Sequence, residues 1–206
     1  MDVLAHALWS AWPFRLANLK RKRTGKKGFN LWFAAFWGVF PDFFAFTIPI
    51  LWIIFGLLTG SFSFANIPTP DSMEPIANHH WAFQLANVMY SVSHSLIIFA
   101  LIFLSISLIF RKPLWVMLTW LMHIIVDIPS HSYKFYPTPI FWPFSDWKFD
   151  GISWTNGWFM IINYSMILIA YAAIFYYEKK SQGKKLSLKK LKKLKKKIKK
   201  KIKRKM

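Results

Sequence analysis

Residues 120–131 read Trp-Leu-Met-His-Ile-Ile-Val-Asp-Ile-Pro-Ser-His, and the rest of the chain is best interpreted from them outward. His123, Asp127 and His131 are spaced four residues apart, a step that returns to the same face of a helix one turn on. The residues between them are largely apolar, so three ionisable side chains project from one stripe of a helix that otherwise suits hydrocarbon. Ionisable groups within a membrane are costly and are usually functional. Because Pro129 lacks an amide donor, we expect the helix to bend or end there, with His131 folding back over Asp127.

The composition is typical of a membrane protein. Hydrophobic residues make up 55% of the chain and aromatic residues 19%, more than soluble domains usually carry. Several apolar runs approach or exceed the about 20 residues that a membrane-spanning helix needs. The chain has no cysteine, which excludes disulfides, thiolate metal sites and cysteine nucleophiles. A metal site would therefore use His, Asp, Glu or backbone oxygen.

The positive charge is concentrated at one end. The net charge is +20, and 17 of the 28 Lys and Arg residues follow Glu178. We therefore predict two parts, a membrane-embedded domain at residues 1–178 and a polybasic tail at residues 179–206.

The apolar runs predict an all-α fold. Predicted helices cover residues 2–19, 31–58, 76–110, 114–128 and 158–177. The second run is interrupted at Pro41-Asp42, whereas the third contains neither Pro nor Gly and is predicted to be one long helix. Proline- or aromatic-rich segments at 61–75 and 130–157 are predicted loops.

The distribution of Lys and Arg predicts the topology. Basic segments at 20–27, 111–112 and 179–206 are expected in the cytoplasm, and the two predicted loops outside. Four transmembrane helices beginning near residues 31, 85, 114 and 158 satisfy these assignments. Residues 2–19 would then be a fifth, inserted helix that forms a hairpin with the first span. His6 and Asp42 lie equally far from Thr24, so we expect them at the same depth and paired.

Histidines and aspartates from four segments are predicted to gather in the central-to-outer membrane layer, at about 1.5 Å of depth per helical residue. The set is His6, Asp42, His94, His123, Asp127 and His131. Neutral imidazole and carboxylate suit zinc or a similar divalent metal. Six such residues exceed what one tetrahedral ion needs, so two or three ions with a bridging Asp can be accommodated.

Other interpretations remain open for each residue alone. His94 can be a hydrogen-bonded packing residue, Asp42 can cap a helix that restarts after Pro41, and His123 with Asp127 can be an internal pair. A serine nucleophile at Ser93 or Ser95 is disfavoured, because in helical geometry neither reaches the imidazole of His94 and no Gly-flanked nucleophile elbow is present.

Several motifs carry a resemblance to a known family. In order they are Met1-Asp2-x-x-x-His6, Trp37–Asp42, Ser91–Ser95, His123-x-x-x-Asp127-x-x-x-His131 and Phe141–Pro143. Together they resemble the YdjM-like group of membrane-bound metal-dependent hydrolases, most of them bacterial inner-membrane proteins. More distantly, their order is similar to that in zinc-dependent phospholipase C and related nucleases.

The resemblance implies a function and a ligand set. It makes His6, Asp42, His94, His123, Asp127 and His131 the metal ligands and Asp42 a candidate bridge. A later His-x-x-x-Glu pair of the phospholipase type is absent, because His131 is the last histidine. One or two zinc-like ions are therefore expected rather than three.

The tail has the pattern of a cationic amphipathic helix. Leu191, Leu194, Ile198 and Ile202 follow steps of three and four residues among lysines. We expect it to bind anionic lipid. Nucleic acid is a less favoured partner, and a purely topological role is the simplest alternative.

These features predict a membrane-bound metal-dependent hydrolase acting through metal-activated water on a phosphoester of a lipid or lipid-linked substrate. Asp42, His94 and His131 are the predicted catalytic residues, with either histidine as proton carrier where it is not a ligand. The alternatives are a transporter or channel that uses intramembrane His and Asp, and a non-catalytic membrane scaffold. The sequence does not specify the substrate, the metal or the oligomeric state.

Overall fold

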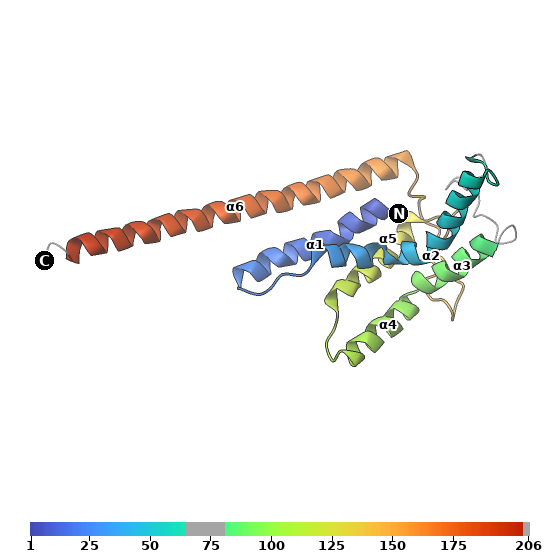
Figure 1. The fold of residues 1–206 in the computed structure, drawn as a ribbon, viewed down its shortest axis with the longest axis horizontal. Coiled ribbons are helices and arrows are strands. Elements are labelled where there is room, and N and C mark those ends of the chain that lie inside the picture. The colour runs from blue at the N-terminus through green and yellow to red at the C-terminus, as the bar shows by residue number, and fades with distance from the viewer. Residues whose placement is uncertain (65–80, 204–206) are drawn as a thin grey trace. The chain divides into compact units, whose positions relative to one another are not determined.

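The computed structural model describes the backbone at residues 1–64 and 81–203, and side chains at 1–64 and 81–180. The described residues form helices and loops without strands, which confirms the all-α prediction. The helices are α1 (Val3–Arg23), α2 (Leu31–Thr59), α3 (Trp81–Ser93), α4 (Leu96–Ile109), α5 (Leu118–Ser130) and α6 (Gly157–Lys203), as Figure 1 shows. The chain divides into two compact units, Met1–Ile167 and Leu168–Met206.

Helices α1 and α2 form the predicted hairpin. Asp2 begins α1, and its carboxylate accepts a hydrogen bond from the backbone of Ala5. Asn30 caps α2 in the same manner. The two helices approach so closely at Gly38 that a Cβ there would lie 1.9 Å from Ser10 Oγ. Glycine at this position therefore allows α1 and α2 to pack together.

Helix α2 runs without interruption through Pro41 and Pro49, so the interruption predicted at Pro41-Asp42 is wrong. A proline inside a helix removes one backbone hydrogen bond and costs about 3 kcal/mol. Packing of α2 against α1, α3 and α5 offsets this cost. Figure 1 shows the axis of α2 turning between its first and second halves, as proline-containing helices commonly do.

The single long helix predicted at 76–110 is also wrong. The chain breaks at His94 and Ser95, and α3 and α4 meet at a bend of 62°. Ser95 Oγ accepts hydrogen bonds from the amides of Ile97 and Ile98 and donates one to the carbonyl of Trp142. The break is thus stabilised by a new helix cap and by the loop that follows α5. The part of the prediction at 76–80, which includes His79 and His80, lies outside the described residues.

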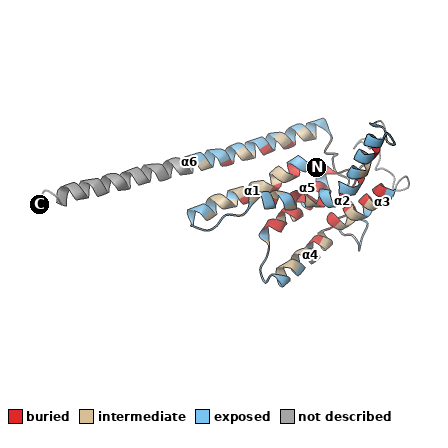
Figure 2. Ribbon diagram, in the orientation of Figure 1, coloured by how far each residue is buried: buried red, intermediate tan, exposed pale blue. Residues whose placement is uncertain are grey.

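Helix α5 is the buried centre of the first unit, as the concentration of red on it in Figure 2 shows. It begins at Leu118 after a 3-10 turn at Trp115–Met117, four residues later than predicted. Trp120 packs against Trp37, Phe40 and Phe99. Its indole nitrogen donates to the carbonyl of Ser93 at 2.7 Å, which ties α5 to the end of α3.

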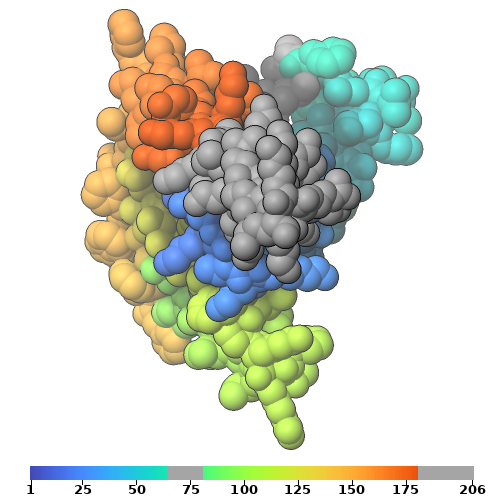
Figure 3. Space-filling model, turned by 90° about the vertical axis from the view of Figure 1, so that its left-hand side faces the viewer, coloured from blue at the N-terminus to red at the C-terminus, as the bar shows by residue number. Residues whose placement is uncertain are grey.

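Two described helices are long and apolar enough to cross a membrane, Leu31–Thr59 and Gly157–Lys180. The bent pair Trp81–Ser93 and Leu96–Ile109 is a third, if it is one broken span. Trp115–Ser130 is apolar but shorter. Figure 3 shows the end of α4 projecting from the packed helices, where Leu108 is 77% exposed. Membrane association is supported, whereas the count of four spans plus an inserted helix stays a prediction.

The tail continues α6. The helical backbone extends to Lys203, through most of the residues predicted as a polybasic tail. The boundary between the two compact units falls inside α6, eleven residues before the predicted boundary at 178/179.

Candidate metal centre

All six predicted ligand residues lie within one cluster, and four separate segments contribute to it. Helix α1 contributes His6, α2 contributes Asp42, the break between α3 and α4 contributes His94, and α5 with its C-cap contributes the rest. The links are ion-pair distances to the two aspartates, Asp42 and Asp127.

Asp42, His94, His123 and Asp127 form the tighter part of the cluster, and one ligand atom from each lies within 4.8 Å of the others. His94 Nε2 and His123 Nε2 are 3.0 Å apart. Asp127 Oδ2 lies 3.5 Å from the first nitrogen and 3.1 Å from the second. Asp42 Oδ1 lies 3.6 Å from each. We call these four residues the central group.

Backbone carbonyls orient the two imidazoles of the central group. His123 Nδ1 is 2.7 Å from the carbonyl oxygen of Gly38, and His94 Nδ1 is 3.2 Å from that of Tyr90. A carbonyl only accepts, so Nδ1 is the donor at each of these contacts, and a neutral ring with its proton there presents a lone pair at Nε2. A metal-ligating histidine is commonly held this way, with its other nitrogen donating to a carbonyl.

With both rings in this neutral tautomer, the central group brings four acceptor atoms together. Asp127 Oδ2 is buried and has no hydrogen-bond partner. A shared cation would satisfy all four atoms. Ligands about 2.0–2.2 Å from a tetrahedral zinc ion are about 3.3–3.6 Å apart. The five distances between 3.0 and 3.6 Å bracket that spacing, so the residues fit such an ion.

A second set of atoms surrounds the other oxygen of Asp127. Its Oδ1 lies 2.9 Å from His6 Nε2, 3.5 Å from His131 Nε2 and 2.6 Å from the Met1 amino nitrogen. The Met1 amino group also lies 2.8 Å from His131 Nε2. The His6 ring stacks on that of His123, with centroids 3.7 Å apart. We call His6, His131 and the Met1 amino group the outer group.

Asp127 is consequently the residue shared by both groups. One of its carboxylate oxygens faces the central group and the other faces the outer group. The ion-pair contacts of Asp42 are to His94 and His123, within the central group. The geometry therefore favours Asp127 over Asp42 for the bridging role that the resemblance implied.

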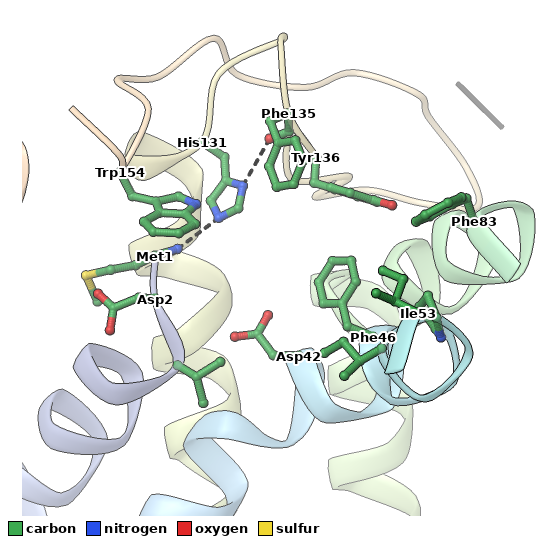
Figure 4. A pocket seen from close by; sticks show the side chains of 13 residues that line it. Met1, Asp2, Asp42, Phe46, Ile53, Phe83, His131, Phe135, Tyr136 and Trp154 are labelled. Carbon is green, nitrogen blue, oxygen red and sulfur yellow. Dashed lines mark hydrogen bonds between the residues drawn. The ribbon is translucent and has the colours of Figure 1, made fainter. Parts of the chain in front are cut away.

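The cluster is buried except on one side. The side chains of His94, His123 and Asp127 are at most 1% exposed, whereas those of Asp42 and His131 are 12% and 8% exposed. Asp42, His131 and Met1 also line a cavity of about 380 Å³ (Figure 4). The cluster is therefore closed on the side of His94, His123 and Asp127 and borders the cavity on the side of Asp42 and His131.

No family model, curated protein or solved structure matches the chain.

Two local expectations are corrected by the structure. His6 pairs with Asp127 and not, as predicted, with Asp42, because Asp127 projects toward α1 from α5. Ser93 Oγ lies 2.9 Å from His94 Nδ1, although helical geometry was expected to prevent this contact. The helix ends at Ser93, which frees its side chain to reach both this ring and the carbonyl of Pro41.

Several supporting groups were not predicted. The carbonyl of Gly38 fixes the ring of His123, and the phenol ring of Tyr90 stacks on His94 with centroids 3.7 Å apart. Tyr90 precedes His94 by four residues, which is about one helical turn, so this spacing could have predicted their contact. The sequence holds no signal for the carbonyl of Gly38, because any residue has one.

Proposed function

We propose that this protein is a membrane-bound metal-dependent hydrolase that cleaves a phosphoester of a lipid or lipid-linked substrate. One observation carries the proposal. One ligand atom from each of His94, His123, Asp42 and Asp127 lies within 4.8 Å of the others, and the cluster borders a ligand-sized cavity through Asp42 and His131. A buried packing cluster would need donors for these acceptors and would have no reason to border a cavity.

A divalent metal such as zinc, when bound, lowers the pKa of a coordinated water and polarises a phosphoryl oxygen. The central group would hold one ion, in agreement with the expected one or two ions. On the other side of Asp127, the Met1 amino group places a positive charge 2.6 Å from Oδ1. The carbonyls of Gly38 and Tyr90 keep His123 and His94 in the tautomer that binds metal.

His131 is better situated than His94 to carry a proton to the leaving group. It lines the cavity, and because its Nδ1 lies 3.3 Å from the carbonyl of Phe135, its Nε2 is the atom that would take up a proton and pass it to the leaving group when His131 is not a metal ligand. His94 is fully buried within the central group. We therefore assign His94 to metal binding, and Asp42 to metal binding at the cavity side.

The resemblance to YdjM-like hydrolases supports the same function. Together with this function we propose that the chain lies in a bacterial inner membrane, with four transmembrane helices and an inserted α1. Residues 20–27 and the tail would lie in the cytoplasm. The lysines after Glu178, on a helical backbone, favour anionic lipid as the partner of the tail over nucleic acid.

The test uses the full chain purified in detergent without a histidine tag. Metal content and hydrolysis of bis(p-nitrophenyl) phosphate and of a phospholipid in mixed micelles are measured with added zinc. His123→Ala and Asp42→Ala should lose both bound metal and hydrolysis, whereas Asp146→Ala, an exposed loop aspartate, should lose neither. Ion flux in vesicles without hydrolysis would favour the transporter or channel instead. Absence of bound metal would contradict the proposal.

A further inference from the structure

The cavity beside the cluster has two chemically different ends. Its volume of about 380 Å³ lies within the range of about 300–1,000 Å³ that is typical of small-molecule sites. Its ionisable side chains are those of Asp2, Asp42, His131 and Tyr136. Figure 4 shows Asp42 and His131 facing the same space, with Phe83 and Ile53 on the side away from Met1.

The apolar end is built mainly by one face of α2. Phe46, Pro49, Ile50 and Ile53 recur at steps of three and four residues, and Phe83 of α3 closes the wall beside them. Helix α2 is one of the two described helices suited to cross a membrane, so lipid is the natural environment of this wall. A wholly polar substrate would leave these side chains facing water.

We propose that this cavity binds a single alkyl or isoprenoid chain of an amphiphilic phosphoester. The chain lies along α2 between Ile53 and Phe83, and the phosphoryl group lies at Asp42 and His131. This inference rests on the proposed hydrolase, and it narrows the substrate to a phosphoester with one apolar chain attached near the scissile group. A short, fully polar phosphoester binds weakly, because it leaves the apolar end unfilled.

The first test is a chain-length series. Ethyl, octyl and dodecyl p-nitrophenyl phosphodiesters are compared in one detergent, and p-nitrophenol release is followed. Burying one methylene strengthens binding about fourfold. The ratio of kcat/KM for the dodecyl over the ethyl substrate should therefore be about 100-fold or more, even when part of the chain stays outside.

Ile53→Trp fills the apolar end and should lower this ratio at least about tenfold. Ile54→Trp is the matched control, since Ile54 is 47% exposed on the same helix and does not line the cavity. Detergent partitioning is common to both variants, so the difference between them reports on the cavity. An equal ratio in the two variants would overturn the proposal.

The second test works without turnover. A dodecylphosphonate carrying a terminal diazirine is photolysed with the wild-type chain, and labelled residues are mapped by mass spectrometry. Labelling should fall on residues 46–53 or on Phe83 and should be displaced by dodecylphosphonate but not by ethylphosphonate. Such labelling without hydrolysis would support the binding site for the apolar chain and would reject the proposed hydrolase activity. Hydrolysis with labelling elsewhere would reject the chain site alone.

Discussion

Replacing Asp127 with Asn should remove metal from the central group and break the contacts of the outer group at once. The carboxylate is fully buried, and its two oxygens face different sets of ligand atoms, Oδ1 toward His6 and His131 and Oδ2 toward His94 and His123. An amide keeps the shape of the side chain but loses its negative charge and replaces one acceptor oxygen with a donor NH₂ group.

The size of the loss in metal affinity follows from the burial of Asp127. Removing one partner from a buried charge pair costs about 3–5 kcal/mol. At about 1.4 kcal/mol per tenfold, metal affinity should fall at least about 100-fold. His6→Gln leaves Asp127 Oδ2 and the other ligand atoms of the central group in place, so it should lower metal affinity less than Asp127→Asn. Comparing the metal affinities of Asp127→Asn and His6→Gln therefore shows whether the Asp127 carboxylate is shared by both groups or belongs to one of them.

The assay is zinc competition against a chromogenic chelator, with metal per chain measured by elemental analysis. Asp146→Asn makes the same charge change at an exposed loop position and should bind metal like the wild type. Circular dichroism checks that each variant keeps its helices. A folded Asp127→Asn chain with wild-type zinc affinity would refute the bridging role and with it our assignment of the centre.

Three further outcomes are expected. Gly38→Ala should lower the free energy of unfolding by about 1–3 kcal/mol, because its Cβ would lie 1.9 Å from Ser10 Oγ; thermal melts measure this, and Ser10→Gly should restore part of the loss. Trp120→Phe leaves the carbonyl of Ser93 without its indole donor and should cost about 1–3 kcal/mol; chemical denaturation followed by fluorescence checks it, and an unchanged midpoint would contradict the role of that bond. Removing metal with a chelator should lower the melting temperature of the wild type, since a ligand at 100 times its dissociation constant stabilises the folded state by about 2.7 kcal/mol. The melting temperature of Asp127→Asn should be the same with and without chelator.

The local part of the centre could be predicted because helical spacing is a property of the backbone. His123 and Asp127 had to share a face of α5, and Pro129 had to end the helix near His131. The structure places the C-cap at His131 with its ring 3.5 Å from Asp127, as expected. The composition likewise sufficed for the all-α class.

The break at His94 could not be predicted in the same way. Residues 81–109 contain no Pro or Gly, and local propensity favours one continuous helix. The break depends on hydrogen bonds to the loop after α5, from Ser95 to Trp142 and from the amide of Leu96 to Ile140. Contacts between segments so far apart in the chain leave no periodic signal.

The sequence alone identified the ionisable side chains that lie in apolar helices and therefore need polar partners. Burial of such a group is unfavourable wherever the helix is positioned. The sequence could not assign their partners. The sharing of Asp127 between two groups, the carbonyl of Gly38 behind His123 and the apolar cavity beside Asp42 each join helices that are distant in the chain. Only tertiary packing brings those atoms within bonding distance. The direction in which a side chain leaves its helix does not determine its partner until another helix packs against that face.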